Sequence, residues 1–162
     1  MNLQKLNGLL GTIANFGVIA GLIFVVIELN QNTNIAEVNA YQNLITQVNE
    51  INQLRATDEE LAALVMKAEL GEELNPVELS QYQSFYRLAT RHADMAFLQF
   101  QKRLISEDQL YGVLGPLRNH LGRDIGKEFW ASERDRNFVP GLADYINAMM
   151  AEIEPDSEFW KK

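Results

Sequence analysis

The feature that most constrains the fold is a long apolar stretch near the N-terminus that carries no charge. Lys5 is followed by 22 uncharged residues, Leu6 to Ile27, before Glu28. From Leu9 to Ile27, the only polar side chains are those of Thr12 and Asn15. A helix of about 20 apolar residues spans the ~30 Å hydrocarbon core of a bilayer. The sequence therefore predicts an N-terminal membrane anchor over residues 1–29 and a separate domain over residues 30–162.

Two other interpretations of this stretch are a buried core helix and a cleaved signal peptide. Core helices of soluble bundles are rarely apolar on all faces over such a length. Val18-Ile19-Ala20 loosely fits a cleavage site, but the most apolar part, Gly21 to Ile27, lies after it. A signal peptide places its apolar part before the cleavage site, so an uncleaved single-pass transmembrane helix is favoured.

Small residues inside the span predict a contact with another helix. Gly17 and Gly21 form a GxxxG pattern, and Ala14 extends the same face. Two glycines one turn apart let a second helix approach closely in lipid, although glycine is common in membrane helices by chance. Asn15 also needs a partner in hydrocarbon, unless it lies close enough to the interface to be hydrated. The predicted partner is a second copy of the chain or another membrane protein.

The remainder has the rhythm of helices. Apolar residues recur every three or four positions and predict a stalk helix over about 30–55, at Ile35, Val38, Tyr41, Ile45, Val48 and Ile51. The amide-rich stretch 30–34 is the place where a kink or break is expected, because its helix propensity is poor.

Helix starts are marked by capping residues. Thr57 with Glu60, Asn75 with Glu78, and Ser106 with Gln109 fit capping boxes, and Gly71 is placed to end a helix. A helix from Asn75 is expected to run to Ile105 and a last one to open at Phe138-Val139-Pro140. The expected buried face of the long helix is Leu79, Tyr82, Phe85, Tyr86, Ala89, Ala93, Ala96, Phe97 and Phe100.

No segment shows a convincing strand pattern. The predicted fold is all-α: a transmembrane helix runs into a stalk, followed by an antiparallel bundle of four to five helices over about 57–154.

Composition excludes several functional classes. Lys and Arg number 14 against 22 Asp and Glu, a net charge of −8, which argues against binding nucleic acid through its phosphates. There is no Cys, and the residues three before His92 and His120 are Ala89 and Leu117, so the Glu-x-x-His motif of di-iron bundles is absent. No P-loop, GxGxxG or G-x-S-x-G motif occurs. We therefore predict no catalytic, cofactor-binding or metal-binding residues and no enzyme activity.

Polar residues on the long helix are candidates for ligand contacts. Arg87, Arg91 and Asp94 follow one face with His92 beside them, and Tyr82 and Tyr86 precede them. The arginine fork suits an anion. The alternative is a solvated face with an Arg91–Asp94 pair, and the charged run 133–136 is expected to be an exposed loop or helix end.

Two aromatic pairs are candidates for contact with a membrane or a partner, Phe129-Trp130 and Phe159-Trp160. Ordinary core packing is the favoured alternative for the first pair. Disorder is the alternative for the second.

Short motifs give a resemblance to a family. The anchor is followed by Gln31-Asn32-Thr33, the long helix holds Phe85-Tyr86-Arg87, and Phe129-Trp130 comes late. In these features the chain resembles an uncharacterised family of short bacterial proteins with an N-terminal membrane helix, a Gln-Asn-Thr signature and a helical domain. Those relatives usually have an Arg before the signature, where this chain has Asn30. The resemblance implies bacterial origin and a membrane anchor, and it implies no activity.

The distribution of charge favours one orientation. Lys5 and the terminal amine precede the span, and no Lys or Arg follows it before Arg55, whereas Glu28, Glu37 and Glu50 do. By the positive-inside rule the N-terminus lies in the cytoplasm. For a bacterial protein this means the inner membrane, with the helical domain periplasmic.

These features lead to one main functional hypothesis, a non-catalytic interaction, scaffold or accessory subunit of a membrane assembly. The first alternative is a membrane-tethered sensor or ligand-binding bundle. The second is a hydrolase.

Overall fold

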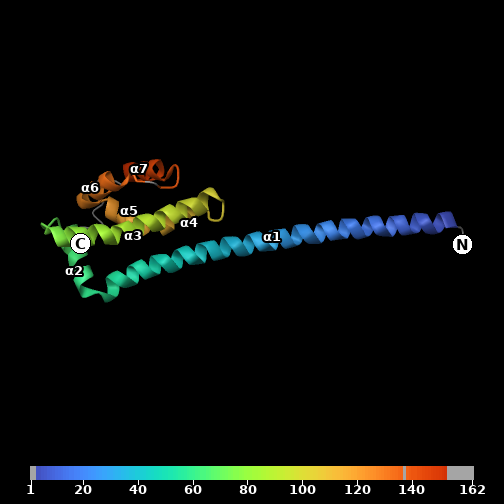
Figure 1. Ribbon diagram of the computed structural model, residues 1–162, viewed down its shortest axis with the longest axis horizontal. Helices are drawn as coiled ribbons and strands as arrows, with labels where there is room; N and C mark the ends of the chain where they lie inside the picture. The colour runs from blue at the N-terminus through green and yellow to red at the C-terminus, as the bar shows by residue number, and fades with distance from the viewer. Residues whose placement is uncertain (1–2, 137, 153–162) are drawn as a thin grey trace. The chain divides into compact units, whose positions relative to one another are not determined.

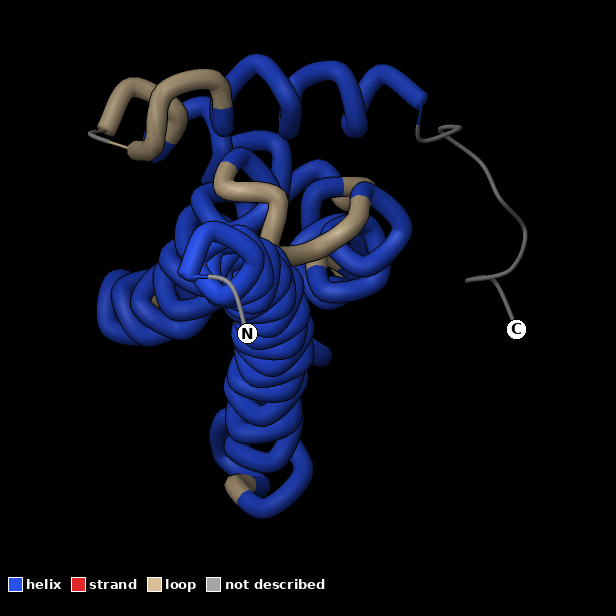
Figure 2. Tube along the Cα trace, turned by 90° about the vertical axis from the view of Figure 1, so that its right-hand side faces the viewer, coloured by secondary structure: helices blue, strands red, loops and turns tan. Residues whose placement is uncertain are grey.

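The chain is all-helical, as the sequence predicts. The computed structural model describes residues 3–136 and 138–152, and within these ranges it contains seven helices and no strand (Figures 1 and 2). The helices are α1 (Leu3–Thr57), α2 (Glu59–Glu69), α3 (Pro76–Gln101), α4 (Glu107–Val113), α5 (Gly115–Leu121), α6 (Asp124–Glu133) and α7 (Leu142–Glu152).

The chain divides into two compact units, Met1–Asn39 and Ala40–Lys162. The first unit is the N-terminal part of α1. Within it, all described side chains from Ala14 to Glu28 are exposed, and one helix is long and apolar enough to cross a membrane. The second unit holds the rest of α1 and the six shorter helices.

Helix α1 continues without a break through residues 30–34, where a kink or break was expected. Thr33 even donates its hydroxyl to the carbonyl of Leu29 within the helix, at 2.9 Å. Extending an existing helix fixes one residue per hydrogen bond, so helix on both sides outweighs the poor propensity of five residues.

The stalk stripe packs only from its middle onward. Tyr41, Ile45, Val48 and Ile51 lie partly buried against the core of the second unit, and Leu44, between the first two on the same face, is fully buried. Ile35 and Val38, in the first unit, are exposed. The apolar period therefore identifies the packed face of this part of α1.

Helix α2 begins one residue later than predicted. The N-cap is Asp58, whose carboxylate accepts from the backbone N–H of Leu61 at 3.0 Å. Thr57 is the last residue of α1, and its hydroxyl donates to the carbonyl of Gln53 at 2.8 Å. Gly71 ends α2 with a positive φ of 77°, as expected.

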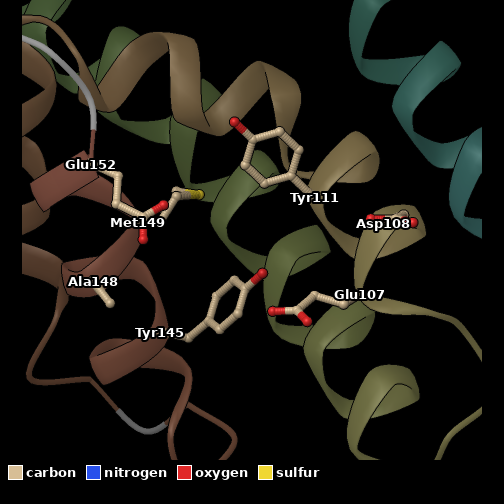
Figure 3. Close-up of a pocket in the computed structure, with 7 residues that line it drawn as sticks. All are labelled: Glu107, Asp108, Tyr111, Tyr145, Ala148, Met149 and Glu152. Carbon is tan, nitrogen blue, oxygen red and sulfur yellow. The ribbon is translucent and has the colours of Figure 1, made fainter.

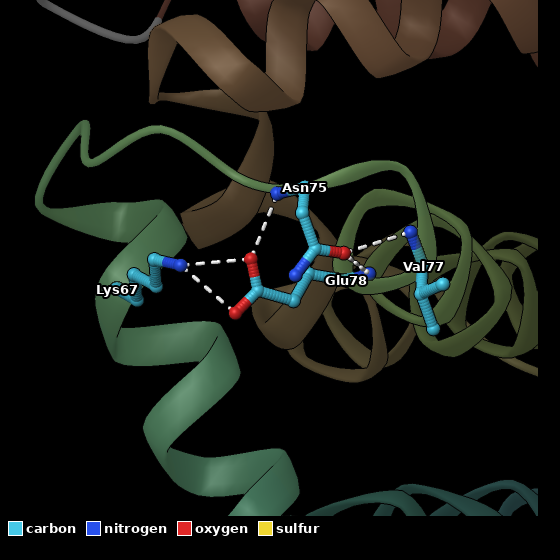
Figure 4. Close-up of polar contacts among 4 residues, drawn as sticks. All are labelled: Lys67, Asn75, Val77 and Glu78. Carbon is cyan, nitrogen blue, oxygen red and sulfur yellow. Dashed lines mark hydrogen bonds and ion pairs between the residues drawn. The ribbon is translucent and has the colours of Figure 1, made fainter.

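The start of α3 is the predicted capping box (Figure 4). The Asn75 side chain accepts from the N–H groups of Val77 and Glu78, and the Glu78 carboxylate accepts from the N–H of Asn75 at 2.8 Å. Lys67 of α2 donates to both oxygens of Glu78, at 2.8 and 2.7 Å. These donors lower the pKa of the Glu78 carboxyl below its ordinary 4.5, the lysine having the largest effect. The cap thus also ties α2 to α3.

Helix α3 ends at Gln101, before the expected Ile105. Arg103 adopts a left-handed φ of 59°, and the N–H groups of Arg103 and Leu104 donate to the carbonyls of Phe100 and Gln99. This is a Schellman ending with arginine in the position that glycine usually occupies. Of the expected buried face, Leu79 is 39% exposed and Phe100 only partly buried, while the other seven residues are buried.

Between residues 58 and 152, leaving out residue 137, the bundle has six helices after α1, where four to five were expected. The Ser106 capping box is present, and it opens the short helix α4, which only Leu114 separates from the next short helix, α5. Helix α7 begins at Leu142, after Gly141 with φ 91°, and not at Phe138. Proline and glycine lower helix propensity most, which explains the interruption.

Phe129 and Trp130 are core residues, 3% and 2% exposed. Trp130 donates its indole N–H to the Asn147 side chain at 2.9 Å, and its ring stacks on Phe138. Both side chains therefore pack in the core, as the favoured alternative expects. Phe159 and Trp160 lie outside the described residues.

Candidate functional site

A cavity of about 350 Å³ lies within the second unit, between the C-terminal part of α1, the end of α2, α3 and α5. Its most buried lining residues are Phe85, Tyr86, Ala89 and His120. Its exposed lining residues are polar: Asn52, Arg55 and Asn119. Val48, Ile51, Glu69, Gly115 and Pro116 complete the wall. The volume is at the lower end of the range for small-molecule sites, about 300–1,000 Å³.

The residues that line the cavity from α1 and from α3 each share one face of their helix. Ile51, Asn52 and Arg55 lie three, four and seven positions after Val48 on α1, so the four residues share one face of that helix. On α3, Phe85, Tyr86 and Ala89 do the same. The face of α1 that packs against the second unit's core thus changes from apolar to polar residues toward the C-terminal end of the helix, where these residues line the cavity.

His120 is the central polar residue of the site. It is 1% exposed, and its ring stacks on Tyr86 with centroids 3.3 Å apart and planes at 11°. Phe129 meets the same ring edge-on at 5.5 Å. Nδ1 lies 2.9 Å from the Tyr82 hydroxyl, whereas Nε2 is buried without any hydrogen-bond partner in the described structure.

The pairing with Tyr82 favours one tautomer of His120. Tyr82 is fully buried, and His120 is the only described partner of its hydroxyl. If Nδ1 carried the proton, both the phenolic O–H and Nε2 would lack a partner, and each unpaired buried group costs about 1–3 kcal/mol. We therefore assign Tyr82 as donor to Nδ1, which places the ring proton on Nε2 as an unused N–H donor.

Burial keeps the titratable groups of this cluster neutral. Desolvation lowers the pKa of His120 to about 3. Desolvation also raises the pKa of both Tyr82 and Tyr86, and the nearby Glu69 carboxylate raises the pKa of each further. At neutral pH the cluster is an uncharged imidazole between two phenols.

Charge at the cavity comes from an ion pair at its edge. Arg55 donates to Glu69 at 3.3 Å, and the Tyr86 hydroxyl donates to the other carboxylate oxygen at 3.2 Å. Arg123 donates to the backbone carbonyl of Glu69 at 3.4 Å. Arg55 therefore pairs with the Glu69 carboxylate, and Arg123 bonds the backbone of the same residue.

The predicted ligand contacts do not share one site. Tyr86 lines the cavity, and Tyr82 holds His120 behind it. His92 instead bonds Gln47 through Nδ1 at 3.1 Å, and burial lowers its pKa. Arg91 lies 3.6 Å from Asp94 and stacks over Phe138, in agreement with the alternative interpretation of a charge pair.

Arg87 has a structural partner that the sequence did not indicate. It donates to Glu133 at 3.0 Å, and Arg136 pairs with the same carboxylate at 2.6 Å. The Glu133 side chain is only 3% exposed, so its expected exposure is wrong, although α6 does end at this residue. A buried carboxylate needs such pairing to remain charged.

The ligand contacts predicted from the sequence do not include five residues of this site: His120, Arg55, Glu69, Asn52 and Asn119. The helical spacing of Val48, Ile51 and Arg55 was a usable signal for the α1 wall. Nothing in the sequence indicated that α5 would place His120 against Tyr82, which is 38 residues away.

A second cavity, of about 360 Å³, lies between α4 and α7 (Figure 3). It is lined by Glu107, Asp108, Tyr111, Tyr145, Ala148, Met149 and Glu152. Burial raises the pKa of Tyr145, and the carboxylates of Glu107 and Glu152 raise it further. Among the described residues, no group of three or more His, Cys, Asp or Glu side chains is placed to hold a metal ion.

The residues predicted for helix–helix contact lie together on α1 in the first unit. Ala14, Asn15, Gly17 and Gly21 are all exposed, and a Cβ added at either glycine would meet nothing within 4 Å. This face has room for a second helix.

The likeness to the bacterial family with the Gln-Asn-Thr signature stays a prediction. No family model, no curated protein and no solved structure matches this chain.

Proposed function

We propose that this protein is a membrane-anchored helical bundle that binds a small molecule in the cavity between α1, α3 and α5. The anchor rests on the apolar N-terminal part of α1. The binding function rests on the cavity, whose polar edge and aromatic interior match the usual make-up of small-molecule sites.

One observation carries the proposal: His120 lines the cavity while its Nε2 lacks a partner. Buried polar groups in folded proteins are almost always hydrogen-bonded, so such an exception requires an explanation. A ligand oxygen that accepts from Nε2 would remove the cost of leaving this donor unpaired. The site would then be completed by its ligand.

The chemistry of His120 favours binding over catalysis. A general base works best with a pKa near the working pH. The pKa of His120 is lowered to about 3, and its other nitrogen is engaged by Tyr82. The residue thus suits a fixed hydrogen-bond donor better than a proton acceptor.

Filling the cavity tests the function. Gly115 lines the cavity and Gly112 does not, yet an added Cβ meets nothing within 4 Å at either position. We expect Gly115→Leu to abolish ligand-induced shifts of the melting temperature across a metabolite screen of the full-length protein in detergent. Gly112→Leu, the matched control, should keep them. Hits that survive in Gly115→Leu, or no hits in the unmodified protein, would contradict the proposal.

A second candidate function is an accessory subunit that binds other proteins through α1. It is supported by the exposed face of Ala14, Asn15, Gly17 and Gly21, since small residues allow close helix packing in lipid. We expect Gly17→Leu with Gly21→Leu to eliminate a homo-oligomer or a stoichiometric partner in mild-detergent pull-downs. Leu substitution at Val18 and Ala20 is the control, because it leaves the two glycines in place. Recovery of a lone monomer from the unmodified protein would count against this function.

A further inference from the structure

We propose that the ligand of this cavity presents a carbonyl oxygen to Nε2 of His120, and that Tyr82 sets this choice by fixing the tautomer of the imidazole ring. The ligand class is an uncharged carbonyl compound with an apolar body, such as an aryl or alkyl ketone. The inference rests on the proposed function, and it adds the chemical class of the ligand and a residue that determines specificity.

The hydrogen bond to Tyr82 decides what His120 can offer to a ligand. Tyr82 is fully buried, and its hydroxyl lies 2.9 Å from Nδ1 of His120. A neutral imidazole has one donor nitrogen and one acceptor nitrogen. Because the hydroxyl donates to Nδ1, the acceptor is used within the protein. The donor, Nε2, is buried without a partner among the described residues, so the group that completes the site must be an acceptor.

Packing holds the ring of His120 in this orientation. Tyr86 stacks on it with centroids 3.3 Å apart, and Phe129 meets it edge-on at 5.5 Å. Turning the ring over would place a carbon atom where Nδ1 now accepts from Tyr82, and the buried hydroxyl would lose its partner. The position of the free donor is therefore fixed before a ligand binds, which favours affinity and selectivity.

Burial makes an uncharged acceptor the favoured partner of Nε2. His120 is 1% exposed, and burial lowers the pKa of its ring to about 3, with no charged neighbour among the described residues contributing to the shift. A carboxylate bonded to this nitrogen would leave water without a counter-charge, which costs far more than burying a neutral carbonyl. The charged lining residues Arg55 and Glu69 pair with each other at 3.3 Å and leave no net charge at the edge.

The apolar part of the wall suits a hydrocarbon body. Val48 and Ile51 of α1 line the cavity together with Phe85 and Ala89 of α3. All four side chains are buried or partly buried. Removing apolar surface from water against such a wall favours binding in proportion to the area buried. A ligand that was polar throughout would gain nothing from this surface.

The first experiment compares two neutral probes of one shape in the full-length protein in detergent. Acetophenone has a carbonyl oxygen where α-methylstyrene has a CH₂ group. Ligand-detected NMR gives the dissociation constant of each probe, referred to its free concentration in the aqueous phase. We expect His120→Phe to weaken binding of acetophenone about tenfold, the effect of one lost hydrogen bond, and to leave binding of α-methylstyrene unchanged.

The second experiment tests the role of Tyr82 with a probe of opposite polarity. Indole donates through its N–H and has no strong acceptor, so it can bond Nε2 only if the ring proton moves to Nδ1. Tyr82→Phe removes the hydroxyl that opposes this move. We expect the ratio of affinities for acetophenone over indole to fall about tenfold in this variant. Tyr145→Phe, which loses a hydroxyl at the other cavity, should keep the ratio.

The tautomer itself can be observed. The chain has two histidines, so ¹⁵N-histidine labelling gives few signals, and His120→Phe identifies those of His120. We expect a proton on Nε2 and none on Nδ1, with the Nε2 signal shifting when acetophenone is added. A proton on Nδ1 in the unmodified protein would overturn the assignment of Tyr82.

The outcomes separate this inference from the function on which it rests. If benzoate binds more tightly than acetophenone and Gly115→Leu removes that binding, a small-molecule site exists and the uncharged carbonyl class is wrong. The inference also fails if His120→Phe weakens both neutral probes equally, or if acetophenone does not bind. If no compound of the wider screen binds, the proposed function fails as well. Thermal melts of each variant establish that a lost signal is not a lost fold.

Discussion

At the scale of single residues, His120 links the candidate site to folding stability. Its pKa in the folded protein is lowered to about 3 from an ordinary 6.5, because burial disfavours the charged ring. Between these values the unfolded chain binds a proton that the folded chain does not bind. The contribution of neutral His120 is therefore fully present above pH 6.5 and is lost progressively as the pH falls toward 3.

His120→Phe tests this linkage. Phenylalanine keeps the stacking on Tyr86 but leaves the Tyr82 hydroxyl unpaired, so we expect a loss of about 1–3 kcal/mol at pH 7. Because the variant no longer binds this proton on unfolding, the difference from the unmodified protein should shrink by about 2 kcal/mol between pH 7 and pH 5. Urea denaturation at both pH values measures it. A difference that stays constant would mean that the folded protein binds this proton as readily as the unfolded chain does.

Gly126 is required for the close approach of α6 to α5. A Cβ at this position would lie 2.0 Å from the carbonyl oxygen of His120 and 2.6 Å from its carbonyl carbon. These are backbone atoms, so no side-chain rotation relieves the clash. We expect Gly126→Ala to cost about 2 kcal/mol or more, since overpacking moves the backbone that carries His120.

Gly112→Ala is the matched control for Gly126→Ala. Its Cβ meets nothing within 4 Å, and it lies inside α4. Alanine there should stabilise the protein by about 0.5–1 kcal/mol, because glycine is the poorer helix former. Chemical denaturation of the two variants checks both signs, and equal stability changes would show that α5 and α6 are not packed this closely.

At the scale of helices, two neighbouring residues, Thr57 and Asp58, are candidates to cap the start of α2. Asp58 accepts from the N–H of Leu61, whereas Thr57 is bonded backward to Gln53 within α1. We expect Asp58→Ala to destabilise by about 1 kcal/mol and Thr57→Ala to change stability by a few tenths at most. Thermal melts of the two single variants are the measurement. The reverse order of effects would restore Thr57 as the cap.

The sequence predicted helix starts where one side chain caps its own backbone. Asn75 and Ser106 each satisfy N–H groups two or three residues away, so their pattern is visible in a short window. At 57–58 two consecutive residues could each cap the next helix. Which of them does so depends on where α1 ends. The end of α3 escaped prediction because Arg103, not glycine, adopts the left-handed conformation there.

The candidate site was less predictable than the fold because it depends on which helix faces meet. The apolar spacing on α1 and α3 identified the faces that pack, including Tyr86. It could not indicate that Glu69, from the end of α2, would reach both Arg55 and Tyr86. Contacts between residues 14 and 17 positions apart on different helices are set by turns and packing, which leave no periodic signal.

At the scale of the whole molecule, the N-terminal unit has an apolar surface and the bundle has a polar one, so the two units are stable in different solvents. The described side chains of the span are exposed, which in water would leave a large apolar surface uncovered. A bilayer removes that cost. Which side of the membrane holds the bundle then depends on the flanking Lys and Arg residues. Lys5 precedes the span and none follows it before Arg55, which predicts a cytoplasmic N-terminus and the bundle on the opposite side.

The absence of cysteine makes this orientation directly measurable. Ser80→Cys places one thiol on an exposed position of α3, and Gln4→Cys places one before the span. In intact bacterial cells we expect a membrane-impermeant maleimide to label the first protein and spare the second until the cells are permeabilised. The reversed pattern would place the bundle in the cytoplasm. Since only the position of the thiol differs, each protein is the control for the expression and reactivity of the other.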